Sequence, residues 1–290
     1  MLKQLLGRVI SFFISAYQKS DLPGKFWFYS KTKGRMGRFL IQHRLKTGRF
    51  WVPWDQWCFW LEYGPENYYL DEFIPFTEVI NALEGDVSFF DLGADIGVVS
   101  ALVAGRCSNI RQVVAVEPNP NSFGILKQNL QALSVPALAL NCAVSNYCGR
   151  ANLHFQNQLG SDHEGFITPQ EEGNTQVFTL SQLVRDNALV LSENRVIKID
   201  VEGQEINTIE GAAELITGAK QVVILLELHP EVLQRDGLSA ESLFQAAEAI
   251  APFEWLLPAQ ENRKVDRNKA FFSQFPEKQY DVIGVSMLQH

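Results

Sequence analysis

Two glycines and two carboxylates stand at spacings that suit the binding of a nucleoside. The apolar run 87–92 contains Asp91 and is followed by Gly93 and Gly97, and Glu117 ends the next apolar run, 24 residues after Gly93. Glycines allow the tight turn from a strand into a helix, and we expect that a Cβ at either position would block a ligand. A carboxylate at the end of the second strand can accept from both ribose hydroxyls. The pattern therefore predicts a ribose-binding turn.

The same turn argues against a pyrophosphate ligand. Dinucleotide-binding folds use G-x-G-x-x-G, whereas this chain has Gly93 and Gly97 without a middle glycine. Asp91 and Asp95 place two carboxylates where a pyrophosphate needs neutral or positive surroundings. S-adenosylmethionine carries a sulfonium and an ammonium group and no phosphate, so it fits this turn better than a nicotinamide cofactor. A tight turn in an unrelated α/β protein is the alternative.

Two later apolar runs, 195–201 and 221–228, carry groups at their ends that can accept a proton. Asp200 lies at the end of the first run, and His229 directly follows the second. Open α/β sheets bind ligands over these strand ends. Methyl transfer is an in-line displacement in which an acceptor oxygen loses its proton, and imidazole titrates near neutral pH, so His229 is our candidate general base. Asp200 is the competing base, and His229 could instead only cap the strand before Pro230.

The acidic neighbours of Asp200 leave a second chemistry open. Glu202 follows it by two residues, and Glu227 lies near the end of the neighbouring run. If the three carboxylates converge, their oxygen atoms would suit magnesium better than zinc; otherwise we assign no metal ligands. Lys198, inside the strand, is expected to pair with a neighbouring acid in the core rather than to act chemically.

Four segments resemble the successive motifs of the FkbM-type methyltransferases, namely Asp91–Gly97, Glu117–Pro120, Asn141–Val144 and Lys198–Gly203. The likeness runs from about residue 68 to 288, and the block 198–203 is its most specific part. These are class I enzymes that use S-adenosyl-L-methionine. The resemblance implies cofactor contacts by Asp91, Gly93, Asp95, Gly97, Glu117, Pro118, Asn141, Ala143 and Asp200. The family usually has Asn at the position of Asp95, but a carboxylate can still accept from the methionine ammonium.

The resemblance also implies the reaction. We expect O-methylation of a hydroxyl on a sugar, a lipid-linked or a secondary-metabolite acceptor, so the partner is a small molecule or a glycan. Related enzymes bind adenine at the place of Asn141 and Ala143, although Asn141 could equally be only a polar strand end. A non-catalytic nucleoside-binding or membrane-associated scaffold protein with the same fold is the alternative, and an NAD-dependent oxidoreductase is less favoured.

A doubly wound α/β fold must position these residues, and 290 residues with 46% hydrophobic content suffice for its core. We predict a seven-stranded, mostly parallel, Rossmann-like sheet, with the last two strands pairing antiparallel at its edge. The expected strands are 87–92, 112–116, 137–144, 195–201, 221–228, 253–257 and 281–288, and the expected helices 72–83, 121–133 and 239–250. Residues 153–156 and 176–178 are expected to form a hairpin around the polar loop 160–173, a candidate lid.

Charge divides the chain unevenly. Residues 1–50 hold eleven Lys or Arg and one acid, a charge of +10, while the remainder holds 14 against 32, a charge of −18. Apolar residues recur at helical spacing over residues 2–17, which suits an amphipathic helix on an anionic membrane surface. The run is too short to span a bilayer and lacks a signal-peptide cleavage pattern, so we expect it to be retained. Packing on the catalytic domain or on a second subunit, as in a homo-oligomer, is equally compatible, and nucleic acid is not expected.

Aromatic residues gather between this basic arm and the first motif, and five of the six tryptophans lie there. Such rings can stabilise a small cap or wall an acceptor pocket, and packing is favoured. We therefore divide the chain into a basic, aromatic-rich extension, 1–67, and a methyltransferase domain, 68–290. The four cysteines form no metal-binding spacing, which indicates reduced thiols, no zinc site and a cytoplasmic protein, peripheral on the inner face of a membrane if the arm binds lipid.

Overall fold

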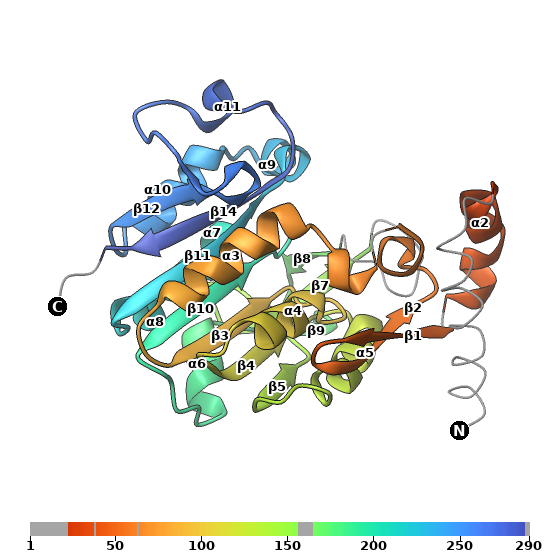
Figure 1. Cartoon of the computed structure of the whole chain (residues 1–290). Coiled ribbons are helices and arrows are strands. Elements are labelled where there is room, and N and C mark those ends of the chain that lie inside the picture. The colour runs from red at the N-terminus through yellow and green to blue at the C-terminus, as the bar shows by residue number, and fades with distance from the viewer. Residues whose placement is uncertain (1–22, 38, 63, 156–164, 288–290) are drawn as a thin grey trace.

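The computed structural model describes residues 23–37, 39–62, 64–155 and 165–287. Within these ranges the central sheet has eight strands in the order β13-β12-β14-β11-β10-β3-β4-β5 (Figure 1). Five neighbouring strands are parallel: β3 (Val87–Leu92), β4 (Ile110–Val116), β5 (Ala137–Leu140), β10 (Asn194–Ile199) and β11 (Gln221–Leu228). The predicted doubly wound, mostly parallel sheet is confirmed.

The last strands pair antiparallel, as predicted. β14 (Tyr280–Ser286) lies between β11 and β12 (Phe253–Leu257) and runs antiparallel to both. The strand beyond the predicted seven is β13 (Arg263–Lys264), which adds two residues to the edge beside β12. Because β14 is inserted at this point, its residue Asp281 comes to lie opposite Glu227 of β11.

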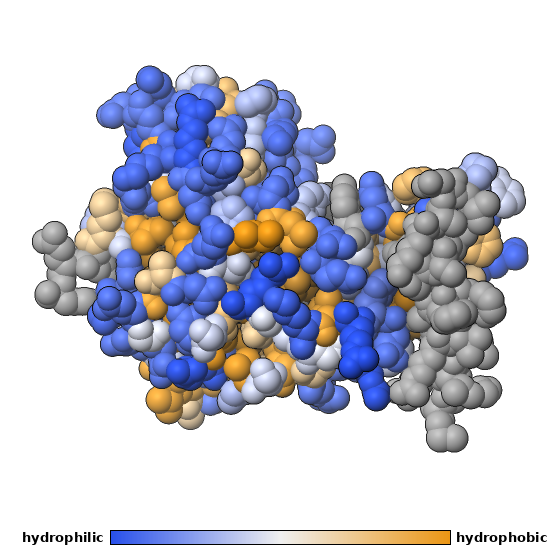
Figure 2. All heavy atoms as spheres, in the orientation of Figure 1, coloured by the Kyte–Doolittle hydropathy of each residue, from blue (hydrophilic) through white to orange (hydrophobic). Residues whose placement is uncertain are grey.

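Apolar side chains on both faces of the parallel strands explain their near-continuous hydrophobic runs. All six residues of β3 are buried. One face packs against α3 (Leu70–Ala82), α4 (Val98–Arg106) and α5 (Pro120–Leu130). The other packs against α6 (Leu180–Asp186), α7 (Glu205–Gly211), α8 (Ala213–Thr217), α9 (Pro230–Asp236) and α10 (Ala240–Glu248), while α11 (Phe271–Gln274) and the 3-10 turn Pro258–Gln260 lie near the sheet edge. Figure 2 shows mostly hydrophilic side chains over α9 to α11 and an apolar band over α3.

The first described residues form a helix and a hairpin that join the same core. These are α2 (Lys25–Met36), β1 (Leu40–Leu45) and β2 (Gly48–Pro53), followed by a π-helical turn (Cys58–Glu62) and a 3-10 turn (Pro65–Asn67). The rings of Trp54 and Trp60 stack at 4.3 Å and are almost fully buried in a cluster that includes Phe89 of β3. Most of the aromatic cluster therefore packs. The boundary near residue 67 stays a prediction, and the expected amphipathic helix over residues 2–17 lies outside the described residues.

A smaller four-stranded sheet corrects two predictions. It comprises β6 (Ala143–Val144), β7 (Gly149–His154), β8 (Phe166–Pro169) and β9 (Thr175–Phe178). The expected strand 137–144 is divided, because β5 belongs to the central sheet and β6 to this one. Leu153 pairs with Ile167 of β8 and not with the 176–178 segment, which pairs with the start of β7. The predicted lid loop is therefore partly strand, and its residues 160–164 lie outside the described ones.

Side-chain caps mark the start of α10 and of α5. Ser239 caps α10, since its Oγ accepts from the N–H of Ser242 at 3.2 Å, as the sequence predicted. Asn119 caps α5 in the same way, accepting from the N–H of Asn121 at 3.0 Å.

Among the described residues, none of the helices combines the length and the apolar character needed to cross a bilayer.

Candidate functional site

A cavity of about 600 Å³ opens over the carboxyl ends of β3, β4, β10 and β11. Its lining includes seven of the ten residues that the sequence assigned to catalysis or to cofactor contact, which are Gly93, Asp95, Glu117, Pro118, Ala143, Asp200 and His229. Parallel strands bring these positions together because their carboxyl ends meet at one edge of the sheet. Asp91, Gly97 and Asn141 lie outside the lining.

The glycine turn has the backbone shape that requires glycine, but for a reason that the sequence did not indicate. Gly93 and Gly97 have φ values of 74° and 86°. A Cβ on Gly93 would overlap the carbonyl oxygen of Asp200, and one on Gly97 would lie 2.7 Å from a methyl carbon of Leu126. Both glycines therefore allow close approach of the chain to itself, and the expectation that a Cβ would also block a ligand stays a prediction. Asp95, with φ 46°, is of a type that tolerates this region.

Glu117 lies at the end of β4 with its carboxylate held by the backbone. One carboxylate oxygen accepts from the N–H of Asp95 at 2.8 Å, and the other from the N–H of Asn119 at 2.7 Å. Burial, followed by the nearby Asp95 carboxylate, raises the pKa of Glu117 to about 8. Each oxygen keeps a lone pair, so the side chain can still accept from a ligand in the cavity that it lines.

Two predicted cofactor residues hold the loops and do not line the cavity. Asp91 is fully buried and accepts from the N–H of Ser100 at 3.0 Å and from its hydroxyl at 2.6 Å, which fixes the start of α4. The amide of Asn141 donates to the carbonyls of Glu117 and Pro118, at 2.8 and 3.1 Å. Asp91 thus holds the glycine turn and Asn141 the segment after β4, and their direct contact with a cofactor stays a prediction.

Lys198 pairs with acids in the core, as predicted. Its ammonium lies 2.7 Å from a carboxylate oxygen of Asp200 and 3.7 Å from one of Asp91, and it donates to the carbonyl of Gly93 at 3.1 Å. Burial acts to lower the pKa of Lys198, but the carboxylates of Asp200 and Asp91 raise it above its ordinary value. The lysine therefore stays charged and ties β10 to the glycine turn.

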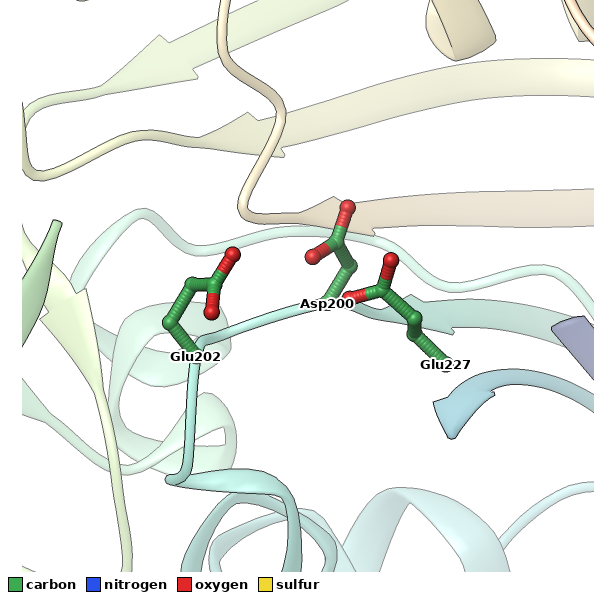
Figure 3. Close-up of side chains that lie close together, drawn as sticks. All are labelled: Asp200, Glu202 and Glu227. Carbon is green, nitrogen blue, oxygen red and sulfur yellow. The ribbon is translucent and has the colours of Figure 1, made fainter. Parts of the chain in front are cut away.

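Three carboxylates converge at the mouth of β10 and β11. Asp200, Glu202 and Glu227 each place an oxygen within 4.8 Å of the others, and Figure 3 shows the side chains turned toward a shared space. Burial, followed by the charge of the hydrogen-bonded Asp200 carboxyl group, raises the pKa of Glu227 well above its ordinary value. The condition that the sequence set for a magnesium-type site is met by these three residues.

Further acids join this end of the cavity from elements distant in the sequence. Burial and then Asp200 raise the pKa of Asp281 to about 7, and burial and then Asp281 raise that of Glu72 to about 8. Both residues line the cavity, and sequence reasoning missed Asp281 as a site residue. Its only signal was its place at the start of the last strand, which could not indicate the neighbouring strand.

His229 presents its ring to the cavity. It precedes α9 and forms no side-chain hydrogen bond that caps this helix, and it is among the residues that line the cavity. Its Nδ1 atom is buried and has no hydrogen-bond partner within the described part of the chain. This atom is enclosed by protein, so any contact of His229 with a ligand comes from the part of the residue that lines the cavity.

Aromatic residues form the remaining wall, which the sequence only partly indicated. The lining includes Trp57, Phe59, Tyr68, Tyr69 and Phe73. Gln56 was missed, since no motif marks it: its amide donates to the carboxylate of Asp95 at 2.6 Å and links the extension to the glycine turn.

Comparisons with known proteins identify similar sequences and structures. A model of the methyltransferase FkbM domain family matches residues 91–251, more than half of the chain. The hexuronic acid methyltransferase AglP of Haloferax volcanii is 26% identical over 160 residues, 54% of this chain and 62% of that protein. This chain therefore matches less than two thirds of that relative's length. Among solved structures, a methyltransferase FkbM from Methylobacillus flagellatus has a TM-score of 0.42 at 17% identity, covering 78% of this chain and 52% of that one. The TYW2 protein of M. jannaschii, solved with AdoMet, has a TM-score of 0.40 at 14% identity, covering 85% and 84%.

Proposed function

This chain belongs to the FkbM methyltransferase family, and from that premise we propose that it transfers a methyl group from S-adenosyl-L-methionine to a hydroxyl oxygen. The observation that carries the proposal is the position of Glu117, which lies in the cavity at the end of β4 beside the glycine turn. Asp95 and Asp200 line the same cavity, so its carboxylates complement a sulfonium and an ammonium group. When bound, the cofactor supplies the methyl group on a positively charged sulfur.

The acceptor that we propose is a sugar, free, lipid-linked or part of a secondary metabolite. Two observations support a polar acceptor with a carbohydrate-like face. The wall combines rings such as Tyr68 and Tyr69 with carboxylates, and rings of this kind stack on sugar faces. The relative from Haloferax volcanii is named for a hexuronic acid.

His229 is the general base in this proposal. It lines the cavity, and no ion pair holds it among the described residues, whereas Asp200 is held by the Lys198 ammonium at 2.7 Å. An ion-paired carboxylate is a weaker base than a free one. His229 therefore accepts the proton of the acceptor hydroxyl while the oxygen attacks the methyl carbon in line with the bond to sulfur, which breaks. Asp200 orients groups at the strand ends.

A divalent cation is the second way to activate the acceptor, and the convergence of Asp200, Glu202 and Glu227 favours it. A hard cation there would lower the pKa of a hydroxyl bound to it. Turnover that disappears with a chelator and returns with magnesium would assign activation to the cation. Turnover that is unaffected by the chelator would leave His229 as the base.

Calorimetric titration of the folded protein with S-adenosylhomocysteine, with NAD and with buffer tests the cofactor. We expect saturable binding of S-adenosylhomocysteine and no binding of NAD. Absence of that binding would overturn the methyltransferase proposal, and binding of NAD would support the oxidoreductase alternative. A mass-spectrometric search of cell extracts incubated with labelled cofactor then seeks a product heavier by one methylene group, which a non-catalytic scaffold would not form.

A further inference from the structure

A second cavity, away from the candidate active site, lies between the β1–β2 hairpin and the end of α5. We call it the hairpin groove; its volume is about 640 Å³, and its polar lining includes Gln42, Arg44, Thr47, Arg49, Gln128 and Gln131. It shares no lining residue with the cavity over the strand ends. Its lining contains no carboxylate among the described residues, in clear contrast to the acidic cavity.

Two arginines face one another across this hairpin. Arg44 and Arg49 are direct partners in the antiparallel register, and both are exposed. Like charges directly opposite each other destabilise a strand pair. In the part of the chain that the structure describes, neither guanidinium forms an ion pair with a carboxylate. The arrangement is unfavourable unless an anion lies between the two cations.

The walls of the groove are held rigidly together. Asn129 of α5 is almost fully buried, accepts from the N–H of Trp51 at 2.7 Å and donates to its carbonyl at 2.9 Å. The same amide donates to the carbonyl of Ile96 at 2.8 Å. A site with fixed walls costs little ordering when a ligand binds.

We propose that the hairpin groove binds an oxyanion, a phosphate or a carboxylate, borne by a polar ligand such as a sugar or a phosphorylated headgroup. The two guanidinium groups donate to the anion in the planar geometry that suits both oxyanions. The amides of Gln42, Gln128 and Gln131 provide donors and acceptors for neighbouring hydroxyls. This inference does not depend on the proposed methyl transfer, because the groove and the catalytic cavity are separate.

Titration of the full chain with inorganic phosphate, at constant ionic strength with chloride as reference, tests the site. We expect saturable one-to-one binding, weakened about tenfold or more in the variant Arg44→Gln/Arg49→Gln because charged hydrogen bonds are lost. The matched control is Lys46→Gln/Lys127→Gln, which removes two exposed cations that lie close by but outside the lining. The control should bind phosphate as the parent does.

Soluble ligands distinguish the sources of the oxyanion. Tighter binding of glucose 1-phosphate, of glucuronate or of glycerol 3-phosphate than of inorganic phosphate would identify a phosphorylated sugar, a uronic acid or a lipid-type headgroup, and each supports the site if the arginine variant loses it. Thermal unfolding without ligand checks the fold, since removing the charge repulsion should leave the melting temperature unchanged or higher. A lower melting temperature with phosphate affinity unchanged would show that the arginines only stabilise the negative end of α5, and would overturn the proposal. Equal binding of phosphate and chloride by the parent protein would also overturn the proposal.

Discussion

Both carboxylate oxygens of Glu117 accept hydrogen bonds from backbone N–H groups, which fixes the position of the side chain. Substitution of Glu117 therefore tests cofactor binding. Glu117→Ala should weaken the binding of S-adenosylhomocysteine by about 1 to 3 kcal/mol, because the hydrogen bonds between this side chain and the ribose hydroxyls are lost. Glu117→Gln keeps the length of the side chain but only one of its two acceptor oxygens. Its affinity for S-adenosylhomocysteine should therefore lie between those of the parent and Glu117→Ala. The exposed Glu171→Ala is the control, and calorimetry gives the dissociation constants. Equal affinity of Glu117→Ala and parent would contradict the ribose contact.

His229 belongs to the chemical step in our proposal and not to cofactor binding. His229→Ala should lower kcat by about 10²- to 10⁴-fold while the dissociation constant of S-adenosylhomocysteine stays the same. The pH profile of the residual activity should also lose the limb that belongs to the base. His154→Ala, which removes an exposed imidazole bonded to Thr168, is the matched control. Unchanged turnover in His229→Ala would move the base to Asp200 or to solvent.

The contact between α4 and α5 explains one of the two glycines of the turn. Gly97→Ala places a methyl group against Leu126 and forces φ 86° on a residue with a Cβ, so it should destabilise the protein by about 1 to 3 kcal/mol. Gly124→Ala in α5 is the opposite case, because a Cβ at this position would lie in open space and alanine favours a helix, so it should stabilise by about 0.5 to 1 kcal/mol. Urea denaturation measures both. A neutral Gly97→Ala would show that α5 moves away at little cost.

The crowding of carboxyl groups makes the stability of the whole ligand-free protein depend on pH. Burial and then repulsion from neighbouring carboxylates raise the pKa of Asp281 to about 7 and those of Glu72 and Glu117 to about 8. The folded chain therefore holds protons that the unfolded chain has released, so stability falls as pH rises toward 8. Burial lowers the pKa of His43 to about 4, which acts oppositely, but only below its ordinary value of 6.5.

The free energy of unfolding should therefore decrease between pH 6.5 and about pH 8, as urea denaturation at the two ends of this range can measure. Glu72→Gln removes one of the three groups, so the decrease should be smaller in that variant. A stability that is constant or rises over this range would show that the carboxyl groups titrate at their ordinary values in the fold.

The predicted membrane contact of residues 1–50 includes α2, which lies within the described residues. Phe26, Trp27 and Phe28 are 56%, 66% and 44% exposed, and exposed cations such as Lys31 follow on a helix without an acidic residue. We expect sedimentation with anionic vesicles that salt weakens and that Trp27→Ala/Phe28→Ala reduces. Phe155→Ala, which removes an equally exposed ring elsewhere, should leave it unchanged. Failure of the parent chain to bind vesicles would favour packing of this arm on protein.

Much of the site followed from the order of residues along the chain. The strand 87–92, the glycine turn and the acid at 117 were predictable because strand burial and backbone turns depend on neighbouring residues. The pairing of Lys198 was predictable for the same reason, since Asp200 lies two residues away on the same strand. The FkbM family model matches residues 91–251, a range that contains the glycine turn, Glu117 and Lys198.

Only the tertiary structure decided which distant groups meet. The insertion of β14 beside β11 puts Asp281 opposite Glu227, and the pairing of β7 with β8 gives Leu153 a partner that the sequence did not indicate. Gly93 is required by the carbonyl of Asp200, and the two arginines of the hairpin groove meet a wall made by α5. Such contacts depend on strand order and helix packing, which arise from burial summed over the whole chain and which no local spacing specifies.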